Sequence, residues 1–167
     1  RRHTGAEWIF SAVREDGLLV AHLIEIQSAN VENSLTFSYE SGADLLARKM
    51  TKITDPFGRD ITLTYESSTC PSGVSKIADF SGREVHYTYN DKCQLTKVRS
   101  PTVIGTPDFR SDMNNDDPAG RTWTYQYVDS GAASNALSGI IAPNEYGTTH
   151  FLRNYTYDAN GYLKTLT

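Results

Sequence analysis

The stretch Gly58-Arg59-Asp60-Ile61-Thr62-Leu63-Thr64-Tyr65 decides the fold, because its pattern recurs twice later in the chain. The later copies are Gly82-Arg83-Glu84-Val85-His86-Tyr87-Thr88-Tyr89 and Gly120-Arg121-Thr122-Trp123-Thr124-Tyr125-Gln126-Tyr127. In each copy, large apolar or aromatic residues stand three, five and seven places after the glycine. Alternation with a period of two places these side chains on one face of a β-strand. Repetition at a spacing of about 20 to 50 residues indicates a repeat architecture, so we predict an all-β repeat protein.

A second pattern consists of two apolar residues three places apart. The pairs are Met50 and Ile53, Val74 and Ile77, Leu95 and Val98, Leu137 and Ile140, and Leu163 and Leu166. Turn-forming residues such as Asp55-Pro56 and Asp79 lie between a pair and the next glycine. The repeating unit is therefore predicted to be an antiparallel β-hairpin of about 20 to 27 residues. Because a spacing of three does not fit simple alternation, either a β-bulge lies within the pair or its two members face opposite sides.

The two patterns together give about five and a half hairpin units, which we expect to stack into one continuous curved sheet, a segment of a shell or barrel. The approximate units are 16–39, 45–65, 74–89, 95–127 with an insertion at 102–117, 137–157, and a partial unit at 163–167. A single hairpin is marginally stable in water, whereas stacked neighbours can bury each other's aromatic faces. Because the last unit stops partway, we expect the single array 1–167 to be a fragment of a longer chain.

Composition and charge exclude several classes of function. The chain has 167 residues, a formal net charge of −4 and a pI of about 5.5. No basic patch stands out to neutralise phosphates, so we expect no nucleic-acid partner. The longest apolar stretch, Leu18 to Ile24, is interrupted by His22 and is too short to cross a bilayer, so we expect no membrane insertion. No signal peptide is recognisable, because Arg1-Arg2 is not followed by an apolar segment.

The segment Tyr155-Thr156-Tyr157-Asp158-Ala159-Asn160-Gly161-Tyr162-Leu163 resembles the YD-repeat (Rhs) family, in which Gly-Arg opens a strand that ends Tyr-x-Tyr-Asp before Gly-x-Leu. Tyr87 to Leu95 is a looser copy, with Asn90 for the aspartate and Cys93 for the glycine. The resemblance covers the chain from about residue 16 onward. It implies a long β-sheet that spirals into a hollow shell, as in bacterial Rhs and Tc-type toxins, or an extracellular scaffold, as in teneurin-like adhesion proteins.

The family's self-cleaving segment, typically Asp-Pro-x-Gly, is not found at the end of this chain. Asp55-Pro56-Phe57-Gly58 matches its opening, but it lies inside a regular repeat and is better interpreted as a turn. No toxin domain is present in the sequence either, so the resemblance implies a wall segment rather than the enclosed polypeptide.

The residues of the repeat are interpreted as structural. They are Gly58, Arg59, Tyr65, Gly82, Arg83, Tyr87, Tyr89, Gly120, Arg121, Trp123, Tyr125, Tyr127, Tyr155, Tyr157, Asp158 and Gly161. We expect the aromatic residues to form a cross-strand ladder that binds hairpin to hairpin, in preference to a sugar-binding platform. We expect the arginines to pair with turn carboxylates or to cover neighbouring tyrosine rings, in preference to binding anions.

The insertion contains a weak candidate for a calcium site. Asp112, Asn114 and Asp116 have the alternate spacing of oxygen ligands in a calcium-binding loop. However, Asp117 replaces the glycine and Trp123 the bidentate glutamate of an EF-hand, which excludes that motif. A solvated insertion loop is the favoured interpretation, so no metal site is predicted.

Cys70 and Cys93 follow equivalent strands, which run parallel in a repeat array and should end at the same edge of the sheet. A disulfide is therefore geometrically allowed, but an intervening strand separates the two positions by about 10 Å. A bridge needs Cα atoms within about 7 Å, so the two loops would have to lean together. The sequence leaves both the bridged and the reduced states open.

We find no local motif for catalysis. The four histidines (His3, His22, His86 and His150) are scattered, and neither a nucleophile elbow nor a phosphate-binding glycine loop is present. We therefore expect no enzymatic activity and no cofactor.

The chain is accordingly expected to be a structural β-repeat scaffold of a secreted or cell-surface, extracellular protein, with the wall of a toxin-encapsulating shell as its leading role. A surface adhesion or binding module and a self-assembling β fibre remain alternatives. The expected partners are neighbouring repeats, other copies of the chain, and an enclosed toxin polypeptide.

Overall fold

The computed structural model describes residues 5–15, 17–28, 33–41, 48–101, 121–143 and 151–167. Twelve strands occupy these ranges: β1 (Glu7–Glu15), β2 (Leu18–Gln27), β3 (Ser34–Tyr39), β4 (Met50–Thr54), β5 (Asp60–Thr64), β6 (Lys76–Ala78), β7 (Glu84–Tyr89), β8 (Leu95–Arg99), β9 (Thr122–Tyr127), β10 (Leu137–Ile141), β11 (Phe151–Tyr157) and β12 (Leu163–Leu166). The predicted all-β fold is confirmed.

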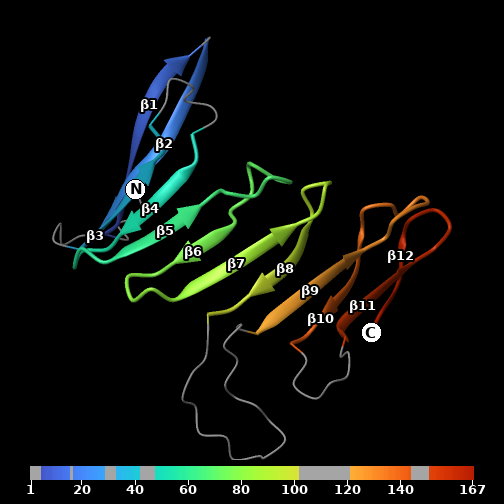
Figure 1. The fold of residues 1–167 in the computed structure, drawn as a ribbon. Coiled ribbons are helices and arrows are strands. Elements are labelled where there is room, and N and C mark those ends of the chain that lie inside the picture. Colours follow the sequence, from blue (N-terminus) through green and yellow to red (C-terminus); the bar gives the residue numbers. More distant parts are fainter. Residues whose placement is uncertain (1–4, 16, 29–32, 42–47, 102–120, 144–150) are drawn as a thin grey trace, which may run out of the picture. The chain divides into compact units, whose positions relative to one another are not determined.

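The strands form one sheet in sequence order, from β1 to β12 (Figure 1). All nine strand pairs with an assigned register are antiparallel. The sheet is therefore a meander of hairpins, as the repeats predict, with β1 and β12 at the two ends of its strand order. The chain divides into two compact units, Arg1–Thr64 with Ile77–Gly82 and Tyr65–Lys76 with Arg83–Thr167.

A β-bulge explains the three-residue spacing of the apolar pairs. Tyr89 lies opposite Leu95, and Tyr87 lies opposite Val98, but the register shifts between them, so that Thr96 has no partner on β7. Corresponding shifts lie in the pairs β3–β4, β9–β10 and β11–β12. Since the bulge adds one residue, both members of an apolar pair face the same side as the tyrosines. Of the two alternatives that the sequence left open, the structure shows the bulge.

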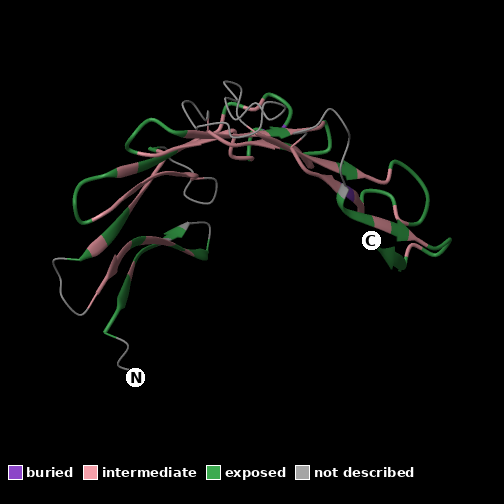
Figure 2. Cartoon of the chain, turned by 90° about the horizontal axis from the view of Figure 1, so that it is seen from below, coloured by how far each residue is buried: buried purple, intermediate pink, exposed green. Residues whose placement is uncertain are grey.

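No second layer covers either face of the sheet in the described part of the chain. Figure 2 shows most of its residues at intermediate or full exposure. Cys70, 3% exposed, is the one buried hydrophobic side chain there. Large apolar side chains such as Trp8, Phe57 and Tyr162 are 61%, 80% and 72% exposed. The described residues include no helix with the length and hydropathy that crossing a membrane requires.

Candidate functional site

The last tyrosine of a strand is fixed by a hydrogen bond to the segment before it. The hydroxyls of Tyr89, Tyr127 and Tyr157 donate to the backbone carbonyls of Val74, Leu95 and Leu137, at 2.9, 2.9 and 2.7 Å. Each acceptor is the first member of an apolar pair. Tyr39 makes the same bond to Leu23 at 2.8 Å. The second tyrosine of Tyr-x-Tyr therefore ties the second strand of a hairpin unit to the start of the same unit, a contact that strand periodicity does not predict.

Burial affects the same tyrosines electrostatically. Desolvation raises the pKa of Tyr39, Tyr89 and Tyr127 above the ordinary value, because a phenolate would lose hydration at the sheet surface. The hydroxyls therefore remain protonated, as hydrogen-bond donors must.

One turn geometry closes the hairpins at both ends. Oδ1 of Asp55 accepts hydrogen bonds from the amides two and four residues later, both at 2.9 Å, and its carbonyl accepts one from Gly58. Asn90 and Asp158 repeat all three bonds, while Asp79 repeats the side-chain bond two residues on and the carbonyl bond. The residue three places on is in the left-handed region: φ is +75° at Gly58 and +56° at Cys93. Such side-chain caps mimic a backbone turn.

Arg59 combines the two roles expected of the repeat arginines, but on different rings. Its guanidinium pairs with the carboxylate of Asp55 at 2.6 Å. It also lies over the rings of Phe57 and Phe80, 5.2 and 5.0 Å from their centroids, in place of tyrosine. The pairing lowers the pKa of Asp55, chiefly through the hydrogen bond from the Arg59 side chain.

The aromatic residues lie in rows that cross the strands. Tyr87, Val98 and Trp123 are register partners on β7, β8 and β9. Tyr125 lies opposite Ile140, which in turn lies opposite Arg153 on β11. The rows thus mix aromatic and aliphatic side chains, whereas an aromatic ladder was expected.

The other predicted residues of the repeat fall on the same framework. Tyr65 follows β5, Gly82 and Arg83 end the turn before β7, Arg121 directly precedes β9, Tyr155 lies on β11, and Gly161 closes the last turn. Gly120 and the candidate calcium ligands Asp112, Asn114 and Asp116 lie outside the described residues.

A disulfide joins Cys70 and Cys93, whose Cα atoms are 5.0 Å apart. Cys93 belongs to the turn after β7, and Cys70 belongs to the loop between β5 and β6, which leans over that turn. Thr69 Oγ1 donates to the carbonyl of Tyr89 at 3.3 Å. At Gly73, an added Cβ would lie 2.8 Å from the Tyr89 ring. Because the loop approaches Tyr89 so closely, Cys70 and Cys93 lie nearer to each other than the intervening strand had led us to expect.

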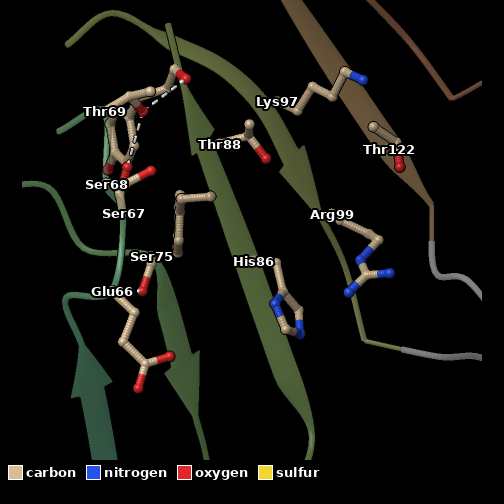
Figure 3. A pocket seen from close by; sticks show the side chains of 12 residues that line it. Glu66, Ser67, Ser68, Thr69, Ser75, His86, Thr88, Lys97, Arg99 and Thr122 are labelled. Carbon is tan, nitrogen blue, oxygen red and sulfur yellow. Dashed lines mark hydrogen bonds between the residues drawn. The ribbon is translucent and has the colours of Figure 1, made fainter. Parts of the chain in front are cut away.

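The disulfide-bonded loop also forms one wall of an open pocket of about 760 Å³ on the polar face of the sheet (Figure 3). Hydroxyl-bearing residues predominate in its lining: Ser67, Ser68, Thr69, Ser75, Thr88 and Thr122. His86, Lys97 and Arg99 supply cationic or titratable groups, and Glu66 the one carboxylate. Nε2 of His86 lies 2.9 Å from the carboxylate of Glu84.

Sequence reasoning missed Lys97, Arg99 and Thr122 as a group. An alignment of the three Gly-Arg stretches contains the signal, because the second residue after glycine is Asp60, then Glu84, then Thr122. No group of three or more His, Cys, Asp or Glu side chains is placed to hold a metal ion within the described ranges.

Comparison of the fold with solved structures finds structures that contain TcdB2-TccC3. The structure of TcdB2-TccC3 without its hypervariable C-terminal region matches with a TM-score of 0.51 and 17% identity, over 90% of this chain and 8% of that one. The structure of TcdB2-TccC3-Cdc42 matches with a TM-score of 0.50 and 16% identity, over 93% and 9%. The chain thus spans less than a tenth of the length of these proteins.

No family model matches the sequence. No curated protein matches it either. At these identities the structural likeness concerns the fold, and it confirms the resemblance to Tc-type toxins that the repeats predicted. The chain has the β-repeat fold found in a part of the TcdB2-TccC3 structures.

Proposed function

We propose that the chain forms part of the wall of an Rhs-type shell that encloses a toxin polypeptide, in a secreted or cell-surface protein. The observation that carries this proposal is the single layer of repeats with the fold of a part of TcdB2-TccC3. A one-layer sheet can serve as a wall, and here tyrosine hydrogen bonds join the two strands of a hairpin unit without a core beneath the sheet.

Exposure of both faces supports a wall in preference to an independent globular domain. A domain of this length ordinarily buries about two thirds of the surface of its unfolded chain around one core. Here the large apolar side chains remain partly or fully exposed throughout the described ranges. A sheet of this kind gains stability from further repeats along its edges and from whatever contacts its faces.

Protease protection tests the proposal in the full-length protein that carries this segment. The rest of that protein is expected to include a polypeptide that resists trypsin while the sheet is intact. A triple variant, Tyr89→Phe, Tyr127→Phe and Tyr157→Phe, removes one hydrogen bond from each of three hairpin units. It should make the enclosed polypeptide digestible at lower urea concentrations than in the parent.

The matched control is Tyr87→Phe with Tyr125→Phe, since neither hydroxyl makes a hydrogen bond in the described part of the chain. If trypsin digested all regions outside this segment at the same rate in the parent and in the triple variant, enclosure would be contradicted. Binding of the intact protein to cells through this segment, without any protected polypeptide, would instead support an adhesion module.

A further inference from the structure

A cross-strand ion pair recurs on the polar face of the sheet. Lys52 pairs with Asp60 at 3.3 Å and Lys76 with Glu84 at 3.0 Å. Each lysine directly precedes the second member of an apolar pair, and each acid stands two places after a repeat glycine. The ion pair is therefore a property of the repeat.

The third copy keeps the lysine and lacks the acid. Lys97 directly precedes Val98, and Thr122 stands two places after the repeat glycine. The strand register confirms the equivalence, because Asp60 lies opposite Thr54 on β4 and Thr122 lies opposite Arg99 on β8. A second cation, Arg99, thus occupies the position of Thr54.

These two cations have no partner in the described part of the chain. Neither the ammonium group of Lys97 nor the guanidinium group of Arg99 makes a hydrogen bond or ion pair there, whereas Glu84 already pairs with Lys76 and His86. Figure 3 shows Lys97, Arg99 and Thr122 on neighbouring strands, with Glu66 across the pocket on the side of the loop. The pocket therefore has a site for negative charge where the other repeats hold their own carboxylate.

We propose that this pocket binds an acidic segment of an extended polypeptide, with a carboxylate of the ligand in the position that Asp60 and Glu84 occupy in their repeats. The ligand carboxylate accepts hydrogen bonds from Lys97 and Arg99, and the hydroxyls of residues 67–69 bind its main chain. A volume of about 760 Å³ suits a segment of a few residues.

The chemistry of the lining favours a peptide over an acidic sugar. Sugar sites usually offer an aromatic face for stacking. The lining includes Tyr87 and Tyr89, but these tyrosines alternate with His86 and Thr88 along β7, so their rings are directed to the opposite face of the strand. The disulfide at Cys70 holds the hydroxyl-bearing wall in place, which reduces the entropy lost on binding. The pocket would bind such a segment whether or not the sheet encloses a toxin.

Fluorescence anisotropy with labelled peptides tests this assignment. The intact protein should bind a six-residue peptide of alternating Glu and Ser, more weakly as salt rises, and should not bind the Gln and Ser peptide. Lys97→Gln and Arg99→Gln should each weaken binding about tenfold, the loss of one charge-assisted hydrogen bond. Thr122→Glu should abolish binding by supplying the internal carboxylate, and Thr122→Gln, of similar size, should not.

Lys164→Gln on β12 is the control for net charge, because that exposed lysine lies outside the pocket lining. An equal loss of affinity in Lys164→Gln and Lys97→Gln would overturn the proposal, as would unchanged binding in Thr122→Glu. Tighter binding of a glucuronate hexamer through the same residues would replace the peptide with an acidic glycan. Thermal unfolding separates loss of binding from loss of fold, and Thr122→Glu should unfold no lower than the parent.

Discussion

The hydroxyl of Tyr127 on β9 donates a hydrogen bond of 2.9 Å to the carbonyl of Leu95 on β8, the first member of an apolar pair. Because the same bond recurs at Tyr39, Tyr89 and Tyr157, it explains why a tyrosine rather than another aromatic residue ends these strands. A phenylalanine there would leave the carbonyl of the neighbouring strand without this partner.

We predict that Tyr127→Phe lowers the free energy of unfolding by about 1 kcal/mol, the net contribution of a typical hydrogen bond. Tyr125→Phe should change it by less than half as much, since the Tyr125 hydroxyl makes no hydrogen bond in the described ranges. Urea unfolding of the three proteins followed by circular dichroism provides the comparison. Equal destabilisation by both substitutions would refute a role for the hydroxyl.

The turn caps predict a contrast between two substitutions of one residue. Asp79→Ala removes the acceptor for the amide of Ser81 at 2.9 Å and should destabilise the protein by about 1 kcal/mol. Asp79→Asn keeps an acceptor for this amide and should lose less stability than Asp79→Ala, because Asn90 accepts the corresponding bond in the turn after β7. If the asparagine variant were as unstable as the alanine variant, the negative charge of Asp79, and not its role as a hydrogen-bond acceptor, would account for its contribution to stability.

Stability should also decrease at acid pH through the paired carboxylates. The pKa of Asp55 is lowered by Arg59, that of Asp60 by Thr54 and Lys52, and that of Glu84 by Lys76 and His86, in each case against desolvation. Their contribution is therefore complete above the ordinary carboxyl pKa values and is lost as pH falls through the lowered values of the folded state.

Asp55→Asn isolates one of these groups, since asparagine keeps the turn acceptor but cannot ionise. Its urea midpoint should depend less steeply on pH than that of the parent between about pH 5 and about pH 2. The pH dependence is measured by urea titrations at intervals across this range. Parallel curves would show that Asp55 titrates alike in the folded and unfolded states.

Removal of the disulfide should loosen the loop between β5 and β6. The bridge spans a sequence separation of 23 residues, for which loop-closure entropy gives a stabilisation of about 3 kcal/mol. The double variant Cys70→Ser and Cys93→Ser is expected to lose stability of that order, and its Ser72 and Gly73 amides should exchange with deuterium faster. Unchanged exchange rates in the loop would mean that the hydrogen bond from Thr69 to the Tyr89 carbonyl keeps the loop in place without the disulfide.

The hairpin repeats could be predicted from the sequence because alternation and turn residues act locally. Glycine and the preceding Asp or Asn specify each turn within a few residues, and the spacing of Tyr87, Tyr89, Leu95 and Val98 allowed a bulge. The sequence alone could not distinguish a bulge from a pair whose members face opposite sides, since the position of Leu95 and Val98 depends on their pairing with the neighbouring strand.

The contacts that sequence reasoning missed are all non-local. The hydroxyl of Tyr127 reaches a residue 32 positions away in the chain, and Cys70 approaches Cys93 because its loop folds over Tyr89. The unpaired state of Lys97 depends on a strand register that the insertion at 102–117 obscures. Each requires knowledge of which strands are neighbours, which periodicity alone does not supply.

Electron cryo-microscopy of the full-length protein that carries this segment tests the wall proposal most directly. We predict a continuous sheet in which β1 to β12 form part of a closed shell, with density for a polypeptide inside it. An isolated sheet with free faces, or identical copies stacked edge to edge into fibres around no enclosed polypeptide, would contradict the proposal.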